Sequence, residues 1–212
     1  MKKLVIYIPS IERGGVEKNL IYISNYFSKN NIDVYIVTAN KDKKKSFHNK
    51  IKIICPKSTR WNNSSRLIKT IICLGLIITK LPLKNISILS FQSNVSAIIL
   101  SKIFNIKIII RLNTSINKYI NNFIKLFFFK IIYSMSNIII VNSLEFKNNL
   151  NKILKLNSIK IFNPIKNKNL NKKLKINYFE NFNGIKILSI GRLTDQKNHI
   201  TIFKSLKILK KK

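Results

Sequence analysis

Short apolar runs alternate with amphipathic stretches along most of this chain, and this alternation is the feature that most limits its fold. The runs 4–8, 33–38, 86–91, 106–111 and 137–142 have the length and the Ile- and Val-rich composition of buried strands. Between them, apolar residues recur every three or four positions, as on one face of a helix. Strands that are separated by helices rather than by hairpin turns form parallel sheets. We therefore predict an α/β fold with a doubly wound, Rossmann-like parallel sheet.

A glycine pair, Gly14 and Gly15, joins the first strand to a helix that the apolar spacing predicts over 16–27. Glycine has no Cβ to crowd a ligand, and the helix points free N–H groups and the positive end of its dipole at the turn. A phosphate or a sugar could bind there. The spacing matches neither the GxGxxG fingerprint nor the GxxxxGK[ST] loop, which disfavours a nicotinamide enzyme or a nucleoside triphosphatase. A purely structural turn explains the pair equally well.

Polar residues follow two later strands where their carboxyl ends would meet. Residues 92–94 (QSN) follow one strand, and the strand 106–111 ends in Arg111, with Asn113 two residues later. An arginine at the end of a buried strand indicates either an ion pair within the fold or an anion to be bound, and the sequence favours neither. The binding site is expected at this edge of the sheet, with Gly14, Gly15, Arg111 and Asn113 in it.

The segment 119–133 (YINNFIKLFFFKIIY) is apolar on most sides and is interrupted by Lys125 and Lys130. A helix packed between the sheet and a neighbour is the favoured interpretation, and an interfacial helix on a membrane surface is the alternative. The most hydrophobic window, 71–78, falls well short of the ~20 apolar residues that span a bilayer. Any membrane association is therefore expected to be peripheral.

The chain has 40 Lys and Arg against 7 Asp and Glu, a formal net charge of +33. Such a charge ordinarily suggests nucleic acid or an anionic membrane as partner. The excess is almost entirely lysine, Ile and Asn are abundant, and alanine occurs only at Ala39 and Ala97. This usage is typical of a very AT-rich genome. We interpret the charge as a solvated lysine-rich exterior, with an anionic membrane surface as the next interpretation and no specific nucleic acid.

Cys55 and Cys73 have no CxxC spacing, so neither a disulfide framework nor a zinc site is indicated, and we expect no metal and no cofactor. The apolar run near the N-terminus, 4–8, is far shorter than a signal-peptide core. We therefore expect a cytoplasmic protein. Its lysines would allow it to attach peripherally to the inner face of the plasma membrane.

A Lys- and Asn-rich stretch, 166–184, has little periodicity and is predicted to be a linker. The predicted domains are 1–165 and 185–212, the second being the first β-α unit of an incomplete Rossmann-like domain. One strand, 185–190, and one helix cannot bury their own apolar faces. We expect the missing part to come from a continuation of the chain or from a second polypeptide, and the chain alone to have little or no activity.

Four motifs, taken in this order, resemble the family-four glycosyltransferases of the GT-B fold. The residues 14–17 (GGVE) resemble the family's GGxE turn, and 136–143 resemble a strand that ends in serine. The segment 160–165 (KIFNPI) is similar to the strand before the interdomain linker, and 191–198 (GRLTDQKN) to the loop that opens the donor-binding domain. Each motif is weak by itself, and their order and separation are specific. The resemblance spans nearly the whole chain.

The resemblance implies a retaining enzyme that transfers a sugar from a nucleotide-sugar donor to a glycan or lipid-linked acceptor of polysaccharide or lipopolysaccharide synthesis. The acceptor side would be formed by 1–165. Arg192 and Lys197 would clamp the donor diphosphate without a metal, because a guanidinium and an ammonium can meet its growing charge. Gly14 and Gly15 would let the backbone approach the donor diphosphate or the acceptor. No protein nucleophile is assigned.

Two departures from the family and two rival functions remain. Many members carry a histidine at the strand end 111–115, and this chain has none there, so Arg111 and Asn113 are the catalytic candidates. The family's donor-side pair of glutamates is absent from these 212 residues. The rivals are a non-catalytic basic protein that binds anionic membrane surfaces and another Rossmann-type nucleotide-binding enzyme.

Overall fold

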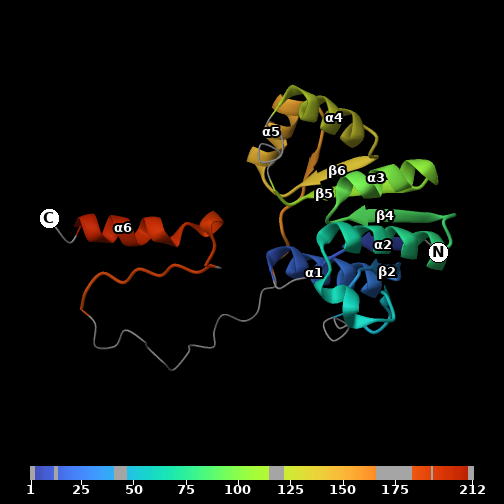
Figure 1. The fold of residues 1–212 in the computed structure, drawn as a ribbon, viewed down its shortest axis with the longest axis horizontal. Coiled ribbons are helices and arrows are strands. Elements are labelled where there is room, and N and C mark those ends of the chain that lie inside the picture. Colours follow the sequence, from blue (N-terminus) through green and yellow to red (C-terminus); the bar gives the residue numbers. More distant parts are fainter. Residues whose placement is uncertain are drawn as a thin grey trace. The chain divides into compact units, whose positions relative to one another are not determined.

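The computed structural model describes residues 3–11, 14–40, 47–114, 122–165, 183–191 and 193–209. The chain divides into two compact units, residues 1–165 and 166–212. Figure 1 shows the helices and strands of the first unit and helix α6 of the second.

The first unit contains a seven-stranded sheet in the order β3-β2-β1-β4-β5-β6-β7, and every neighbouring pair is parallel. Its strands are β1 Lys3–Tyr7, β2 Asp33–Val37, β3 Lys52–Ile54, β4 Ile86–Ser90, β5 Lys107–Leu112, β6 Ile138–Val141 and β7 Ile159–Lys160. The predicted parallel α/β fold is confirmed. The chain winds outward from β1 to β2 and β3, and then returns to place β4 on the other side of β1. The strand order therefore reverses between β1 and β4.

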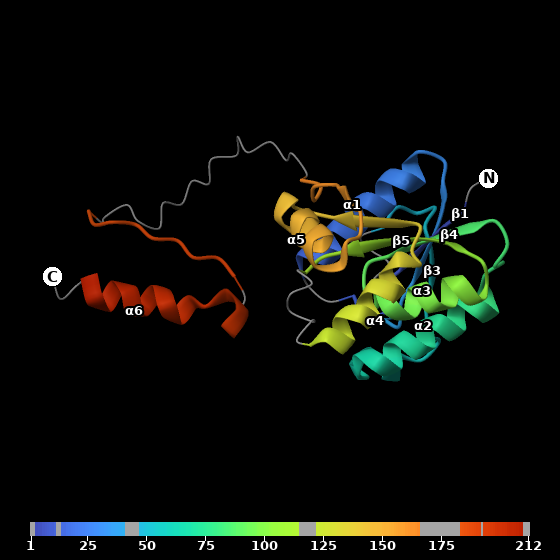
Figure 2. The ribbon, with the colours of Figure 1, turned by 90° about the horizontal axis from the view of Figure 1, so that it is seen from above.

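Helices cover both faces of the sheet. They are α1 Gly15–Lys29, α2 Arg66–Lys80, α3 Asn94–Ile103, α4 Phe123–Ser134 and α5 Leu144–Leu154, with a 3-10 turn η2 at Thr59–Asn63. Figure 2 shows α1 on one side of the strands and α2, α3 and α4 on the other. The predicted helix 119–133 corresponds to α4, and its first three residues lie outside the described residues.

Alternate residues of β1 belong to different cores because successive side chains of a strand point to opposite faces. Val5 and Tyr7 lie in the core beneath α2 and α3, whereas Ile6, and Ile8 just after the strand, lie in the core beneath α1. All four side chains are fully buried. Burying an aliphatic side chain such as that of Val5, Ile6 or Ile8 contributes roughly 1.5–3 kcal/mol. A continuous apolar run is thus what a central parallel strand requires.

The two cysteines differ in their environments, and this difference gives a test of the packing. Cys73 on α2 is fully buried, and burial raises the pKa of its thiol to about 12, whereas Cys55 is half-buried. Because the thiolate is the reactive form, we expect one thiol per native chain to react with a thiol reagent at pH 8. Cys55→Ser should abolish this native reaction and leave Cys73 to react only in denaturant. A native reaction that persists in Cys55→Ser would contradict the buried position of Cys73.

The second unit contains one α-helix, α6 His199–Leu209, and a 3-10 turn, η4 Asp195–Lys197, among its described residues. The predicted strand 185–190 is not formed there. A strand needs a hydrogen-bonded neighbour, and the described part of this unit provides no second strand. The apolar side chains of this segment are exposed, with Leu188 at 77% and Ile190 at 84%.

Candidate functional site

The carboxyl edge of the sheet is the place where this fold can bind a ligand. In open α/β sheets, ligands bind in the crevice where the strand order reverses, because the two connections leave in opposite directions there. In this chain that position lies between β1 and β4. Ser10 follows β1, and Gln92 follows β4. The loops that would line the crevice are therefore those that carry Ser10 and Gln92.

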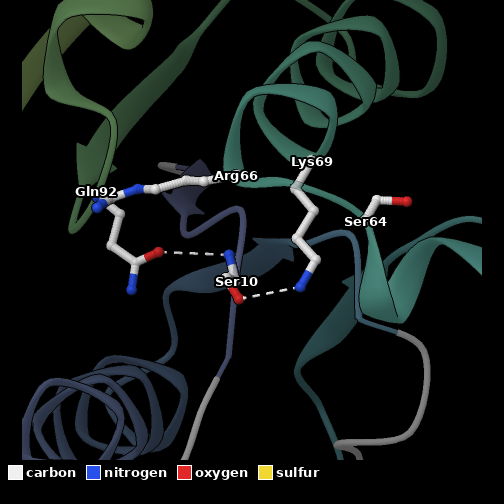
Figure 3. A pocket seen from close by; sticks show the side chains of 5 residues that line it. All are labelled: Ser10, Ser64, Arg66, Lys69 and Gln92. Carbon is white, nitrogen blue, oxygen red and sulfur yellow. Dashed lines mark hydrogen bonds between the residues drawn. The ribbon is translucent and has the colours of Figure 1, made fainter.

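A pocket of about 180 Å³ lies at this position and is lined by Ser10, Ser64, Arg66, Lys69 and Gln92. Figure 3 shows Lys69 extending from α2 to Ser10, with Gln92 on the opposite side of Ser10. The Lys69 Nζ atom donates a hydrogen bond to Ser10 Oγ over 3.3 Å. The backbone N–H of Ser10 donates to Gln92 Oε1, also over 3.3 Å. These bonds join the loops after β1 and β4 to the first turn of α2.

The glycine turn lies at the same edge, where α1 begins. Gly14 and Gly15 are both exposed, and Gly14 has an extended backbone with φ of −171° that any residue can adopt. A Cβ on Gly15 would meet nothing within 4 Å, and one on Gly14 would meet only the flexible carboxylate of Glu17, with Oε2 at 2.8 Å. Neither backbone geometry nor close packing requires glycine at these positions. An approaching ligand would explain the pair.

Arg111 at the end of β5 is only 2% exposed and is bonded within the fold. Its Nη2 donates to Asn163 Oδ1 over 2.8 Å and to the carbonyl oxygen of Ile161 over 3.4 Å. Burial lowers the pKa of the guanidinium, which nevertheless stays protonated at neutral pH. Its Nε is buried and has no hydrogen-bond partner among the described residues. These contacts favour a structural role for Arg111 over the binding of an anion. Its partners are neutral oxygens and not the carboxylate of an ion pair. A catalytic role for Arg111 stays a prediction.

Asn113 joins the ends of two strands. Its Nδ2 donates to the carbonyl oxygen of Phe91, just after β4, over 2.9 Å. In the same region Asn94 Nδ2 donates to the carbonyl oxygen of Arg111, over 3.3 Å, and Asn94 Oδ1 accepts from Ser90 Oγ, over 2.7 Å. These amides hold the carboxyl ends of β4 and β5 together. Asn113 is half-buried beside the edge, and its catalytic role also stays a prediction.

The two cationic residues that the resemblance assigns to the donor diphosphate, beside Gly14 and Gly15, belong to the second unit. Lys197 is exposed in η4, where its backbone N–H donates to the carbonyl oxygen of Thr194 over 2.9 Å. Arg192 lies outside the described residues. Their role in binding a diphosphate stays a prediction.

The described part of the chain contains neither a metal-binding cluster nor a membrane-spanning helix. Within the described ranges, no group of three His, Cys, Asp or Glu side chains is placed to hold a metal ion. Also within those ranges, no helix has the length and apolar character needed to cross a membrane.

Sequence reasoning missed Ser10, Arg66 and Lys69 as lining residues of one pocket. Gln92 is recognisable as a polar residue at a strand end, and Ser10 carries the same signal after β1. Lys69 offers a different signal, because it occupies a position on the buried face of α2, with Thr70, Cys73 and Ile77. A lysine on an otherwise buried helix face indicates a ligand or a buried partner.

Comparison with known proteins finds relatives at the level of structure alone. No family model matches the chain, and no curated protein matches it significantly. HepE of Anabaena, in complex with UDP-glucose, superposes with a TM-score of 0.53 at 14% identity, over 78% of this chain and 44% of that protein. The lipopolysaccharide outer core galactosyltransferase WaaB gives a TM-score of 0.50 at 14% identity, over 80% of this chain and 47% of WaaB.

A plant enzyme has a similar structure. Phytolacca americana UGT2, in complex with UDP-2-fluoro-glucose and pterostilbene, gives a TM-score of 0.51 at 8% identity, over 79% of this chain and 55% of UGT2. The chain thus spans about half the length of these proteins. At such identities the likeness establishes the fold. The first unit has the Rossmann-like fold of GT-B glycosyltransferases.

Proposed function

We propose that this chain forms part of a family-four glycosyltransferase that transfers a sugar from a nucleotide-sugar donor with retention of configuration. The observation that carries the proposal is the GT-B fold, found in neighbours whose structures contain UDP-glucose or a UDP-sugar analogue. The motif resemblance described above supports the assignment to family four. The acceptor would be a glycan or lipid-linked intermediate of polysaccharide or lipopolysaccharide synthesis, as the likeness to WaaB suggests.

The chemistry assigns separate tasks to the two units. Residues 1–165 would bind the acceptor, and Gly14 and Gly15 would give a ligand access to the start of α1. Arg192 and Lys197 would stabilise the charge that develops on the departing diphosphate, which a guanidinium and an ammonium can do without a metal ion. Under this proposal the nucleotide-sugar is a substrate, and no cofactor is needed. A second chain or further residues would complete the donor site.

A peripheral position on the inner face of the plasma membrane is part of the proposal. The observation that favours it is an apolar surface on α4, the α4 patch, in which each side chain is at least 45% exposed. The α4 patch consists of Phe123, Ile124, Phe127, Phe128 and Ile131. The exposed Lys125 and Lys130 flank it and would face anionic headgroups.

Donor titration with a glycine variant tests the proposed function. We expect saturation-transfer NMR to detect weak binding of UDP-glucose or another nucleotide-sugar, and no binding of NAD. Gly15→Leu should weaken this binding at least tenfold, because its side chain would fill the space above the turn. The fold should persist, since a Cβ at position 15 meets nothing within 4 Å and leucine favours a helix by up to about 1 kcal/mol over glycine.

Gly75→Leu is the matched control. Gly75 is an exposed helical glycine on α2 whose Cβ would also meet nothing within 4 Å, and its replacement should leave donor binding unchanged. Binding of NAD alone would favour another Rossmann-type enzyme, and binding of no nucleotide would favour the basic membrane-binding protein. Equal weakening by both leucine variants would contradict the role of the glycine turn.

A further inference from the structure

The pocket at the strand reversal is a cationic cavity built by three separate segments. Ser10 comes from the loop after β1, Gln92 from the loop after β4, and Ser64, Arg66 and Lys69 from the start of α2 and the residues just before it. All five side chains are polar, and none is acidic. Arg66 and Lys69 are three residues apart, so their side chains leave the same side of the helix. The described lining thus has two positive charges and no negative charge.

The burial of Lys69 is not explained by the fold alone. Its side chain is only 7% exposed, yet its ammonium donates to a neutral hydroxyl, Ser10 Oγ at 3.3 Å. A lysine ammonium has three N–H donors, and burying its charge without a counter-charge is costly. Thr70, Cys73 and Ile77 share the buried face of this helix. An apolar residue would satisfy packing at position 69, so the charge indicates a ligand.

The position of the charges along α2 supports the same inference. The helix begins at Arg66, its first turn has no acidic residue, and Ser65 Oγ accepts the N–H of Ile68 over 3.4 Å. The amino end of a helix carries a partial positive charge, so a cation placed there is repelled by the helix dipole. Arg66 and Lys69 add to that positive end instead of offsetting it. An anion in the pocket would make all three charges favourable.

The size and donors of the pocket define the group that it would hold. Its volume of about 180 Å³ is below the ~300–1,000 Å³ of pockets that enclose whole ligands. A lysine ammonium is a point charge, and an arginine guanidinium donates in a planar fork, which together suit a tetrahedral oxyanion. Because Gln92 Oε1 accepts from Ser10, the Gln92 amide NH₂ can donate to the same group.

We propose that this pocket binds a phosphate group, held by Lys69 and Arg66 at the amino end of α2. The inference does not require sugar transfer. If the proposed function also holds, the phosphate would belong to the acceptor, because the pocket lies in the acceptor-side unit. Inorganic phosphate and a phosphate ester on a larger molecule present the same chemistry, so the experiment must distinguish these two sources.

The test is calorimetric titration of the whole chain with inorganic phosphate, at constant chloride near physiological ionic strength, with Lys69→Met as the variant. We expect wild type to bind and Lys69→Met to bind at least tenfold more weakly. Lys80→Met is the matched control, since Lys80 is the exposed last residue of the same helix. Both variants lose one positive charge, and the control should retain the wild-type affinity within twofold.

Thermal melting of Lys69→Met should show a midpoint equal to or above that of wild type, because a buried charge is removed.

The location of binding provides a second readout. Phosphate should shift the backbone amide NMR signals of Ser10, Arg66 and Leu67 in wild type and leave them unshifted in Lys69→Met. Glucose 1-phosphate in place of phosphate distinguishes the sources, because tighter binding assigns the pocket to a phosphate ester and equal binding assigns it to free phosphate. No binding by wild type, or equal loss in Lys69→Met and Lys80→Met, would overturn the proposal and leave only the general positive charge of the chain.

Discussion

Replacing Arg111 with methionine is expected to lower the free energy of unfolding of the first unit by about 2–3 kcal/mol. Methionine keeps the apolar stem of the side chain and removes the hydrogen bonds to Asn163 Oδ1 and the Ile161 carbonyl. Hydrogen bonds from a charged donor contribute about 1.5–3 kcal/mol each, and removal of a buried charge offsets part of that loss. Urea denaturation followed by circular dichroism measures the change.

A double-mutant cycle with Asn163→Ala locates the effect. We expect a coupling energy of about 1 kcal/mol or more between the two positions, because the 2.8 Å contact between Arg111 Nη2 and Asn163 Oδ1 is lost in either variant. Arg60→Met is the control. Arg60 is exposed and lies over the Trp61 ring at 4.4 Å, so its replacement should cost no more than about 1 kcal/mol.

The outcome also decides between the two interpretations of an arginine at a strand end. If the role of Arg111 is to attach the segment that follows β7 to strand β5, Arg111→Met should be less stable than wild type. Its phosphate binding in the Lys69 pocket should then be unchanged. If Arg111 exists to bind an anion, the variant keeps its stability and loses affinity for a nucleotide-sugar or for phosphate. Unchanged stability together with a lost ligand would therefore contradict a structural role for Arg111.

The sheet was predictable from sequence because each strand carries its own local signal. β1, β4 and β5 are short and mostly Ile, Leu and Val, and the residues between them have helical spacing. The parallel arrangement therefore follows from physical rules for burial. The location of the candidate site at the carboxyl edge of the sheet was also predictable, because the carboxyl ends of parallel strands lie together. The position of Gly14 and Gly15 needed no knowledge of long-range packing.

The partners of individual polar side chains were not predictable. Arg111 contacts Asn163, which is 52 residues later, and Lys69 contacts Ser10, which is 59 residues earlier. No pattern in the intervening sequence indicates either pair, because only the order of the strands brings these residues together. The prediction of a strand over 185–190 was wrong although the local signal is strong. The apolar run indicates a strand, but a strand also needs a hydrogen-bonded neighbour, which the described part of the second unit does not provide.

The second large effect is expected at the α4 patch. We expect the purified chain to sediment with anionic liposomes, and Phe123→Ser combined with Phe127→Ser to weaken this binding about a hundredfold. Phe123 and Phe127 are 78% and 57% exposed, so each can insert its ring into the headgroup region. Burying an aromatic side chain is worth about 1.5–3 kcal/mol, and about 1.4 kcal/mol corresponds to a tenfold change in affinity.

Salt separates the contribution of the patch from that of the lysines. The attraction between exposed lysines and anionic lipids is screened as the Debye length falls to ~3 Å at 1 M salt, whereas burial of apolar surface persists. We therefore expect wild type to retain part of its binding in high salt, and the double serine variant to retain none.

Tyr26→Ser is the matched control for this experiment. Tyr26 is a 64% exposed aromatic residue on α1, which covers the opposite face of the sheet from α4. The Tyr26→Ser variant should change liposome binding by less than threefold. The inner face of α4 supplies the physical reason why the serine variants should still fold: Leu126, Phe129 and Ile132 pack against the core, and the substituted rings do not. Recovery of wild type wholly in the supernatant at low salt would show that neither the charge nor the α4 patch brings this chain to a membrane.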